Sequence, residues 1–490
     1  MLFEPLFAHA AARPDDVAII DDSGRYTHQQ LAAMVAGLGM YLSAQTSRDK
    51  VGLLLPSGAA FSASFYGTLL AGKSVVPINF LLGEKEIAHI ITDSGVDMII
   101  TIPQLAGRLK DSTIKIVDFT QLPPSPSELA SNFPTPQADD LAVLMYTSGT
   151  SGLPKGVMLT YGNLQSDVDA AIEHAQLEGQ HKFLGILPLF HSTGLLATML
   201  APMQLGSMTV YIARFSPVAT IKAIREHGIS VMAAVPSMYG ALARLKDAGP
   251  ADVQSLYAAL SGGEPLPANI REAFLQKFNK PLFEGYGLTE TIGPVTINVP
   301  QANSPGSVGR PMPGVIIQTT DDDGNALPQG ESGEVWLKGP MIMKGYFNLP
   351  AETAASLTAD GFFKSGDLGR VDSEGYLHIT GRKKDLIIVA GEKAVPREIE
   401  EVLMTHPAVA EAAVVGKKDP SRGEVVAAFV VLRDGVEAKS DELREVCRAH
   451  GLASFKVPRE ILFVKELPHS PTGKVLKRVL AEQLKAEPAT

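Results

Sequence analysis

A loop rich in glycines and hydroxyls, with one lysine, carries the most evident chemistry in this 490-residue sequence. Residues 146–156 read YTSGTSGLPKG and directly follow an apolar run at 142–145. Successive backbone N–H groups in such a loop form an anion-binding concavity, and hydroxyl and ammonium groups complete a phosphate cradle. The loop does not fit the Walker A pattern GxxxxGK[ST], because Pro154 precedes Lys155 and Gly156 follows it. It does not fit the dinucleotide-binding pattern GxGxxG either. The sequence therefore predicts a phosphate site of another kind at residues 147–155.

Alternating apolar strands and helical patterns must position this loop. Runs typical of buried strands lie at 51–55, 75–78, 98–102, 142–145, 207–212 and 229–234, with helical patterns at 27–42 and 60–70. This alternation predicts an α/β fold with largely parallel sheets. From about residue 309 shorter strands with turn signals indicate a β-rich, barrel-like subdomain. After residue 381 the pattern is mixed again, with strands expected at 386–389, 412–415 and 425–432 and helices at 396–405 and 440–450.

Length and charge suggest where the chain divides. At about 150 residues per domain, the length favours roughly three domains or subdomains. The segment from Lys383 onward has 18 basic and 17 acidic residues, net +1, whereas the preceding part has 25 and 36, net −11. We therefore expect an N-terminal domain at 1–382 and a C-terminal domain at 383–490.

Composition excludes several classes of protein. The net charge of −10 argues against a protein that coats nucleic acid, and the single cysteine, Cys447, cannot form an internal disulfide. The N-terminus lacks the features of a signal peptide, and the C-terminus matches no retention or peroxisomal signal. The most apolar segment, 183–213, is interrupted by prolines and glycines, so no membrane span is expected. These features favour a cytoplasmic location.

The loop resembles the signature of the adenylate-forming superfamily, which comprises acyl-CoA synthetases, adenylation domains of peptide synthetases, and luciferases. The other motifs of that family follow in order along nearly the whole chain: LPLFH at 187–191, SGGE at 261–264, GYGLTE at 285–290, GEVW at 333–336, SGD at 365–367, GRKKD at 381–385 and PTGK at 471–474. The resemblance implies a large N-terminal domain of two α/β subdomains and a β-rich subdomain, followed by a small mobile α+β lid.

The implied reaction uses ATP, Mg²⁺ and coenzyme A. A carboxylate attacks the α-phosphate of ATP, giving acyl-AMP and pyrophosphate, and a thiol then takes the acyl group. Because two anions must meet, cations and oriented N–H groups are the main catalytic need. By resemblance, Lys474 bridges the substrate carboxylate and the α-phosphate, and Glu290 and Thr147 lie at the metal. Glu290 as a solvated surface residue is the plain alternative.

The resemblance also assigns the nucleotide contacts. Asp367 is expected to accept hydrogen bonds from the ribose hydroxyls, with Arg382 adding a donor. Tyr286 would lie along the adenine, or would be a core tyrosine on a tight turn. The remaining expected contacts are Thr147, Ser148, Gly149, Thr150, Ser151, Gly152 and Lys155 at the phosphates, and Gly262, Gly263, Glu264, Glu284, Gly285 and Gly287 around the base. Thr289 is expected to contact the nucleotide as well.

The C-terminal part would provide a hinge and a thiol tunnel. Lys384 matches the hinge position, about which the lid of the family rotates between the two half-reactions. By resemblance, Ala390, Gly391 and Glu392 correspond to the segment lining the pantetheine tunnel. Relatives commonly have two glycines here, and Ala390 departs from that pattern. A cluster of basic residues could meet the phosphates of coenzyme A or form a solvated face: Lys417, Lys418 and Arg422.

The expected acyl pocket is apolar. By family analogy it is lined by His191, Val235, Ser237, Met238, Tyr239 and Gly262. The segments 183–213 and 229–243 contain no Asp, Glu, Lys or Arg, so they offer no counter-charge to an amino acid or a dicarboxylate. A medium- or long-chain fatty acid therefore fits best, with aryl acids second. His191 could gate the tunnel or be a satisfied core histidine.

Several interpretations stay open at this point. The first is a free-standing acyl-CoA synthetase. An aryl-acid or o-succinylbenzoate-type CoA ligase and an enzyme that loads a separate carrier protein are alternatives, and a non-catalytic acyl or nucleotide sensor is a third class. The expected partners are small molecules, not nucleic acid; a peripheral membrane contact and a homodimer are left open.

Overall fold

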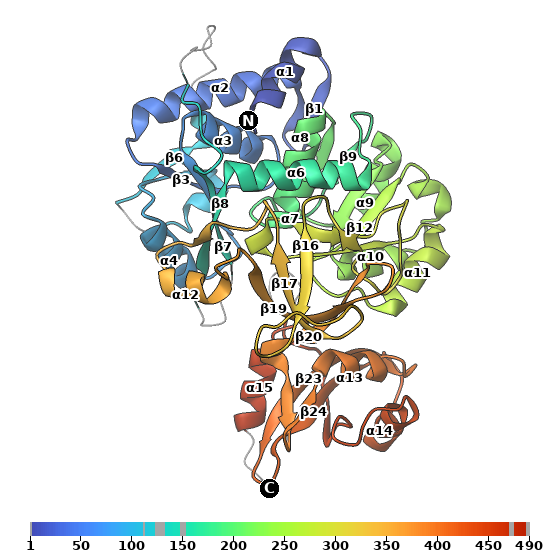
Figure 1. The fold of residues 1–490 in the computed structure, drawn as a ribbon. Helices are drawn as coiled ribbons and strands as arrows, with labels where there is room; N and C mark the ends of the chain where they lie inside the picture. Colours follow the sequence, from blue (N-terminus) through green and yellow to red (C-terminus); the bar gives the residue numbers. More distant parts are fainter. Residues whose placement is uncertain (1, 111–112, 123–132, 148–152, 470–474, 487–490) are drawn as a thin grey trace. The chain divides into compact units, whose positions relative to one another are not determined.

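The computed structural model describes residues 2–110, 113–122, 133–147, 153–469 and 475–486, and side chains only as far as Leu484. The chain forms two compact units (Figure 1). The first comprises Met1–Ile317 with Leu337–Phe363, and the second comprises Gln318–Trp336 with Lys364–Thr490. The predicted boundary at residue 382 falls within the second unit. This boundary was placed at the start of the part that is expected to rotate, and it stays a prediction.

The first unit contains two large sheets. The nine-stranded sheet has the order β15-β14-β13-β12-β11-β9-β10-β1-β2, and β13, β12, β11, β9, β10 and β1 are parallel to their neighbours in this series. Its strands are β1 (Val17–Asp21), β2 (Gly24–Thr27), β9 (Phe183–Gly185), β10 (Thr209–Tyr211), β11 (Val231–Ala234), β12 (Ala258–Ser261), β13 (Phe283–Gly287), β14 (Pro294–Ile297) and β15 (Arg310–Pro311).

The seven-stranded sheet has the order β18-β8-β7-β4-β3-β5-β6. Its strands are β3 (Lys50–Leu54), β4 (Ser74–Pro77), β5 (Met98–Thr101), β6 (Lys115–Asp118), β7 (Leu141–Thr147), β8 (Lys155–Thr160) and β18 (Gly345–Tyr346). Here β4, β3, β5 and β6 are parallel, whereas β8 pairs antiparallel with both β7 and β18. The predicted α/β fold with largely parallel sheets is confirmed.

Helices follow most strands of the first unit (Figure 1). They are α1 (Glu4–Ala12), α2 (His28–Gln45), α3 (Ala59–Leu70), α4 (Glu84–Ser94), α5 (Pro103–Ala106), α6 (Tyr161–Ala175), α7 (Ser192–Leu195), α8 (Ala201–Leu205), α9 (Pro217–His227), α10 (Pro236–Ala243), α11 (Ala268–Phe278) and α12 (Pro350–Ser356). A π-helical turn, η2 (Leu196–Leu200), joins α7 to α8, and short 3₁₀ turns are η1 (Phe119–Gln121), η3 (Pro250–Val253) and η4 (Thr289–Thr291).

The second unit is built around two further sheets. A four-stranded sheet has the order β16-β17-β19-β20, and another has the order β22-β21-β24-β23 with β25 beside β24. The strands are β16 (Ile316–Thr320), β17 (Gly333–Lys338), β19 (Phe363–Val371), β20 (Leu377–Arg382), β21 (Ile387–Val389), β22 (Glu392–Ala394), β23 (Val409–Asp419), β24 (Gly423–Leu432) and β25 (Glu460–Phe463). The helices are α13 (Pro396–Leu403), α14 (Ser440–Ala449) and α15 (Lys477–Ala486), and a 3₁₀ turn is η5 (Lys383–Asp385).

Local sequence explains why these elements form. Helix α2 begins at a capping box, in which the Thr27 hydroxyl accepts from the Gln30 N–H and the Gln30 side chain accepts from the Thr27 N–H. It packs closely on α3, and glycines allow this close approach. A Cβ at Gly39 on α2 would meet Leu70 on α3, and a Cβ at Gly67 on α3 would meet Leu38 on α2. The apolar segment at 183–213 is divided among β9, α7, η2, α8 and β10. No helix in the described part of the chain is long and apolar enough to cross a membrane.

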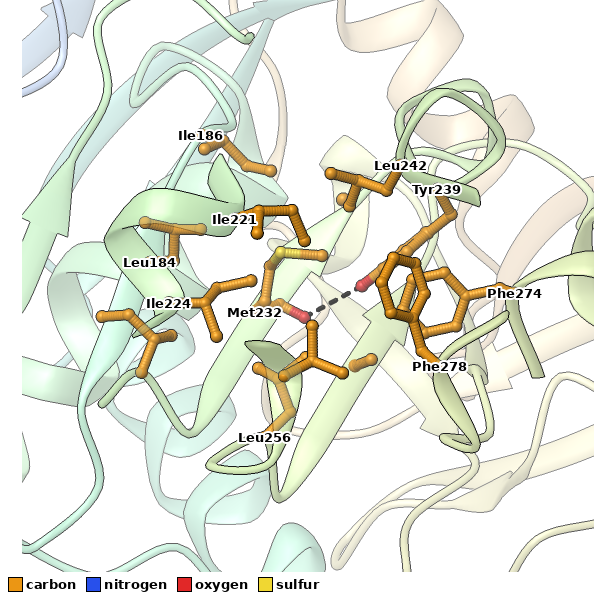
Figure 2. Close-up of a cluster of buried hydrophobic side chains, with 14 of the residues drawn as sticks. Leu184, Ile186, Ile221, Ile224, Met232, Tyr239, Leu242, Leu256, Phe274 and Phe278 are labelled. Atoms are coloured by element: carbon orange, nitrogen blue, oxygen red, sulfur yellow. Dashed lines mark hydrogen bonds between the residues drawn. The ribbon is translucent and has the colours of Figure 1, made fainter. Parts of the chain in front are cut away.

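A core of aliphatic and aromatic side chains covers β9, β11 and β12 (Figure 2). Tyr239 is fully buried there, 5.1 Å from the Phe274 ring in an edge-to-face arrangement. Its hydroxyl lies within hydrogen-bonding distance of the carbonyl oxygens of Met232 (3.1 Å, dashed in Figure 2) and Leu260 (2.8 Å), which ties α10 to the sheet. The structure thus gives Tyr239 a packing role, and the acyl-pocket role predicted for it is not needed to explain its burial.

Candidate functional site

The two ends of the glycine loop are placed side by side. Strand β7 ends at Thr147 and β8 begins at Lys155, and these two residues are register partners across the antiparallel pair. The Tyr146 hydroxyl donates to Asp93 Oδ2 (2.6 Å), and burial, followed by this carboxylate, raises the Tyr146 pKa. Ser148, Gly149, Thr150, Ser151 and Gly152 lie outside the described residues. The hairpin therefore brings Thr147 and Lys155, the two described ends of the predicted phosphate loop, next to each other.

The loop lysine is in contact with a carboxylate. The Lys155 ammonium forms a salt bridge with Glu352, in the first turn of α12, and lies 5.6 Å from the centroid of the Tyr346 ring. Glu352 is 197 residues from Lys155 in sequence, and it was not a candidate in the sequence analysis. No local signal pointed to it, since an acidic residue after Pro350 is also what a helix N-terminus favours by itself.

The candidate metal ligand is joined to the same cluster. Glu290 is half-buried in η4, and its Oε1 accepts a hydrogen bond from the Tyr346 hydroxyl (2.7 Å). Its carbonyl accepts from the Met343 N–H (2.9 Å). Burial, and secondly the Glu290 carboxylate, raise the Tyr346 pKa, so the phenol keeps its proton and remains a donor. Sequence reasoning missed Tyr346 because only the pairing of β18 with β8 brings it to this cluster.

The predicted adenine segments follow neighbouring parallel strands. Gly262, Gly263 and Glu264 come directly after β12, and Gly285, Tyr286 and Gly287 end β13. The carboxyl ends of parallel strands are where open α/β sheets bind ligands. Gly287 has no room for a side chain, because a Cβ there would lie 1.9 Å from the Gly293 carbonyl oxygen.

Glu284, also predicted at the nucleotide, has a clear structural task. It is 5% exposed, its Oε1 accepts from the Leu266 N–H (2.9 Å), and its carbonyl accepts from the Asn298 N–H (2.9 Å). It therefore ties the loop after β12 to β13. Tyr286 and Thr289 are half-buried on the turn that leads to Glu290.

The predicted acyl-pocket residues lie on three separate segments of the first unit. His191 is half-buried at the start of α7, with its ring centroid 4.9 Å from that of Phe190. Val235 and Met238 are half-buried and Ser237 is exposed at the start of α10, directly after β11. Because β11 lies between β9 and β12, the His191, Val235 and Gly262 segments all follow strands of one parallel series.

The second unit contains the remaining predictions. Asp367 is 3% exposed, and its Oδ1 forms an ion pair with Arg382 Nε (2.9 Å) across the β19–β20 pair. Lys384 lies in η5, and Ala390 and Gly391 form the turn between β21 and β22.

Of the basic cluster, Lys417 is paired with Glu460 (2.6 Å), whereas Lys418 and Arg422 are exposed. Lys474 lies outside the described residues, as does the rest of the PTGK motif.

Comparison with known proteins identifies the family. The chain matches the AMP-binding enzyme family over residues 6–347 and the AMP-binding enzyme C-terminal domain over residues 398–474. The chain therefore belongs to the family of AMP-binding enzymes, as the motifs predicted.

Individual relatives cover almost the whole chain. A long-chain-fatty-acid–CoA ligase of Bacillus subtilis (strain 168) is 35% identical over 98% of this chain and 94% of its own. A sulfoacetate–CoA ligase of Cupriavidus necator is 35% identical over 97% of both. Among solved structures, O-succinylbenzoate coenzyme A synthetase from Bacillus subtilis, in complex with ATP and magnesium ion, has a TM-score of 0.87 at 32% identity, covering 98% of this chain and 99% of that one.

Proposed function

We propose that this AMP-forming acid–thiol ligase activates an apolar carboxylic acid, first of all a medium- or long-chain fatty acid, and transfers the acyl group to coenzyme A. The observation that carries the choice of acid is the absence of Asp, Glu, Lys and Arg from residues 183–213 and 229–243. The strands β9 and β11 within these segments are buried, so a charged substrate tail would have no counter-ion there.

Identity to relatives does not choose the acid. The long-chain-fatty-acid and the sulfoacetate ligases are both 35% identical to this chain. The O-succinylbenzoate synthetase supports an aryl acid as the second candidate, with similar coverage. The chemistry of the lining segments is therefore the better guide, and it favours a tail without charge.

The proposed first half-reaction brings two anions together. The α-phosphate and the substrate carboxylate would be bridged by Lys474, and the β- and γ-phosphates would lie in the loop from Thr147 to Lys155. Tyr286 would contact the adenine, and Asp367 the ribose. Such positive charges and N–H groups stabilise the charge that develops at the α-phosphate as the adenylyl group is transferred to the carboxylate and pyrophosphate leaves.

The residues at Glu290 fit a magnesium ion. A half-buried carboxylate offers the oxygen ligands that Mg²⁺ prefers, and Mg²⁺ commonly binds through one or two carboxylates plus substrate phosphates. Thr147 would add a hydroxyl. When bound, the ion would neutralise phosphate charge. The Tyr346 hydroxyl holds Oε1 of Glu290, which orients the carboxylate.

A panel of carboxylic acids tests the proposal. The full chain would be assayed with ATP, Mg²⁺ and coenzyme A for pyrophosphate release and thioester formation, with straight-chain fatty acids, aryl acids, dicarboxylates and amino acids. We expect the highest kcat/KM with fatty acids of medium or long chain. Activity confined to aryl acids would select the second candidate, and pyrophosphate release without thioester would indicate a carrier protein as the thiol. No turnover with any acid by the folded protein would contradict the proposal and favour a sensor.

A further inference from the structure

The segment that contains β18 and the start of α12 contacts two residues of the proposed site: Lys155, proposed to bind the triphosphate, and Glu290, proposed to bind the metal. Glu352 forms a salt bridge with Lys155, and Tyr346 donates to Glu290. The side chains of Lys155 and Glu352 are 20% and 40% exposed, so solvent screens this pair only in part. The ammonium proposed to bind phosphate is thus paired with a carboxylate of the same chain.

The backbone holds Glu352 near Lys155. Strand β18 pairs with β8, where Tyr346 is opposite Val157, and the Phe347 N–H donates to the Gly156 carbonyl (2.8 Å). The Tyr346 N–H donates to Thr353 Oγ1 (2.9 Å), which ties the first turns of α12 to β18. Glu352 therefore stays close to the end of the glycine loop whether or not Lys155 is in contact with it.

A carboxylate in this place resembles a phosphate to the lysine. Both present oxygen atoms with negative charge to a flexible ammonium group, which binds as a point charge. The β- and γ-phosphates must draw Lys155 away from Glu352, and Glu352 then repels them. Both effects weaken the binding of the triphosphate.

We propose that Glu352 is an internal competitor of the nucleotide β- and γ-phosphates for Lys155, and that it sets the affinity for ATP. This inference rests on the proposed role of Lys155 at the phosphates. The opposite possibility, that Glu352 orients Lys155 toward the phosphates, predicts the opposite change in affinity, so the two are separated by the sign of one measurement.

The test compares Glu352→Gln with the native chain. Dissociation constants would be measured by calorimetry for the magnesium complex of α,β-methylene-ATP, which cannot be cleaved at the reacting bond, and for AMP, which lacks the β- and γ-phosphates. We expect Glu352→Gln to bind the triphosphate about three- to tenfold more tightly at low salt, with a smaller gain at high salt. The affinity for AMP should change less than about twofold, because AMP does not reach Lys155.

A matched control separates this contact from a general change in charge. Glu226 on α9 is also ion-paired with a lysine, Lys222 (3.9 Å, four residues earlier), and Glu226→Gln removes the same charge at a distant helix. It should leave both affinities unchanged. Glu352→Ala is a second variant for the case that glutamine forms a new hydrogen bond to Lys155.

A double-mutant comparison tests the competition itself. In a Lys155→Met background, Glu352→Gln should improve triphosphate binding less than in the native background. Weaker or unchanged triphosphate binding by both Glu352 variants would overturn the inference, and so would an equal gain in both backgrounds, which would leave only distant repulsion. If the native chain bound no nucleotide, the proposed function would fail together with this inference; normal binding by the native chain with unchanged Glu352 variants would overturn the inference alone.

Discussion

At the scale of single residues, burial of the Asp167 carboxyl group lowers the stability of the fold. It lies on α6, is fully buried, and neither carboxyl oxygen has a hydrogen-bond partner among the described residues. Gly293 lies beside it, since a Cβ at Gly293 would be 3.0 Å from Asp167 Oδ2. Burial raises the Asp167 pKa well above its usual value. A buried carboxyl without partners costs about 1–3 kcal/mol, and more when it is ionised.

This pKa shift predicts how stability depends on pH. The folded state holds the Asp167 proton more tightly than the unfolded state. The contribution of this proton to the free energy of unfolding is therefore fully present below the unfolded pKa of about 3.9, and it is lost as the pH rises through the folded pKa. Asp167→Asn should therefore raise the unfolding free energy by about 1–3 kcal/mol at pH 8, with little change near pH 4.

Urea unfolding of the native and variant proteins between pH 4 and 8 measures this difference. Asp169→Asn, an exposed change on the same helix, is the control and should alter neither the midpoint nor its pH dependence. An Asp167→Asn protein that is less stable than the native chain at every pH would show that the carboxyl has a stabilising partner.

The residues of the site were predictable where a motif contains them and not where the fold alone brings them together. Thr147, Lys155 and Glu290 stand in recognisable motifs. Glu352 and Tyr346 contact them only because β18 pairs with β8, almost 190 residues earlier in the chain. Register between strands so distant depends on tertiary packing, which local periodicity does not encode.

At the scale of elements, the turn between β21 and β22 contains a strained residue. Val389 pairs with Glu392, so Ala390 and Gly391 form a two-residue hairpin loop, with φ of 52° and 90°. Such a turn needs positive φ at both central residues, which favours glycine or asparagine. Ala390 therefore places a side chain in an unfavourable backbone conformation.

Substitutions in this turn should have opposite effects. Gly391→Ala should lower the unfolding free energy of the second unit by about 1–2 kcal/mol, although a Cβ there meets no atom within 4 Å. Ala390→Gly should be neutral or stabilising by up to about 1 kcal/mol, because relief of strain exceeds the added entropy of the unfolded chain. Hydrogen exchange of β21, β22 and β24 measures both changes. Equal stability of the Gly391→Ala protein would contradict the assignment of strain.

The bounds of elements were predictable to different degrees. Helix α3 (Ala59–Leu70) and strand β24 (Gly423–Leu432) lie within two residues of their expected ranges, because a continuous apolar run covers most of each element. Strand β23 runs over Val409–Asp419, much longer than the expected 412–415. Residues 416–419 at its C-terminal end are not apolar and are held by backbone pairing with β24, which a hydrophobic pattern does not reveal.

At the scale of the whole molecule, the two half-reactions should depend on different residues. Lys474 is proposed to bridge the carboxylate and the α-phosphate, and its ammonium has no task once the acyl-AMP exists. Lys474→Ala should therefore reduce acyl-AMP formation by at least about 100-fold, a loss of roughly 3 kcal/mol of charge stabilisation. Thioester formation from supplied acyl-AMP should stay within about threefold of the native rate. Equal loss in both assays would contradict the assigned role.

The molecule's class was predictable from motifs in order, whereas its acid was not. The α/β fold and the AMP-binding family follow from patterns that extend over nearly the whole chain. Folds of one kind accept many substrates, so the family does not choose the acid. We proposed that side chains after β9 and β11 line the acyl pocket, and the lack of charge in those segments favours an apolar tail.

The most direct test of that claim is a comparison of two acids of equal length. Dodecanoate and dodecanedioate differ only at the far end, where a methyl group is replaced by a second carboxylate. Burying an unpaired carboxylate costs several kcal/mol, and each 1.4 kcal/mol is a factor of ten, so kcat/KM for thioester formation should be at least about 100-fold higher with dodecanoate. Equal values, or a preference for dodecanedioate, would contradict an apolar acyl pocket.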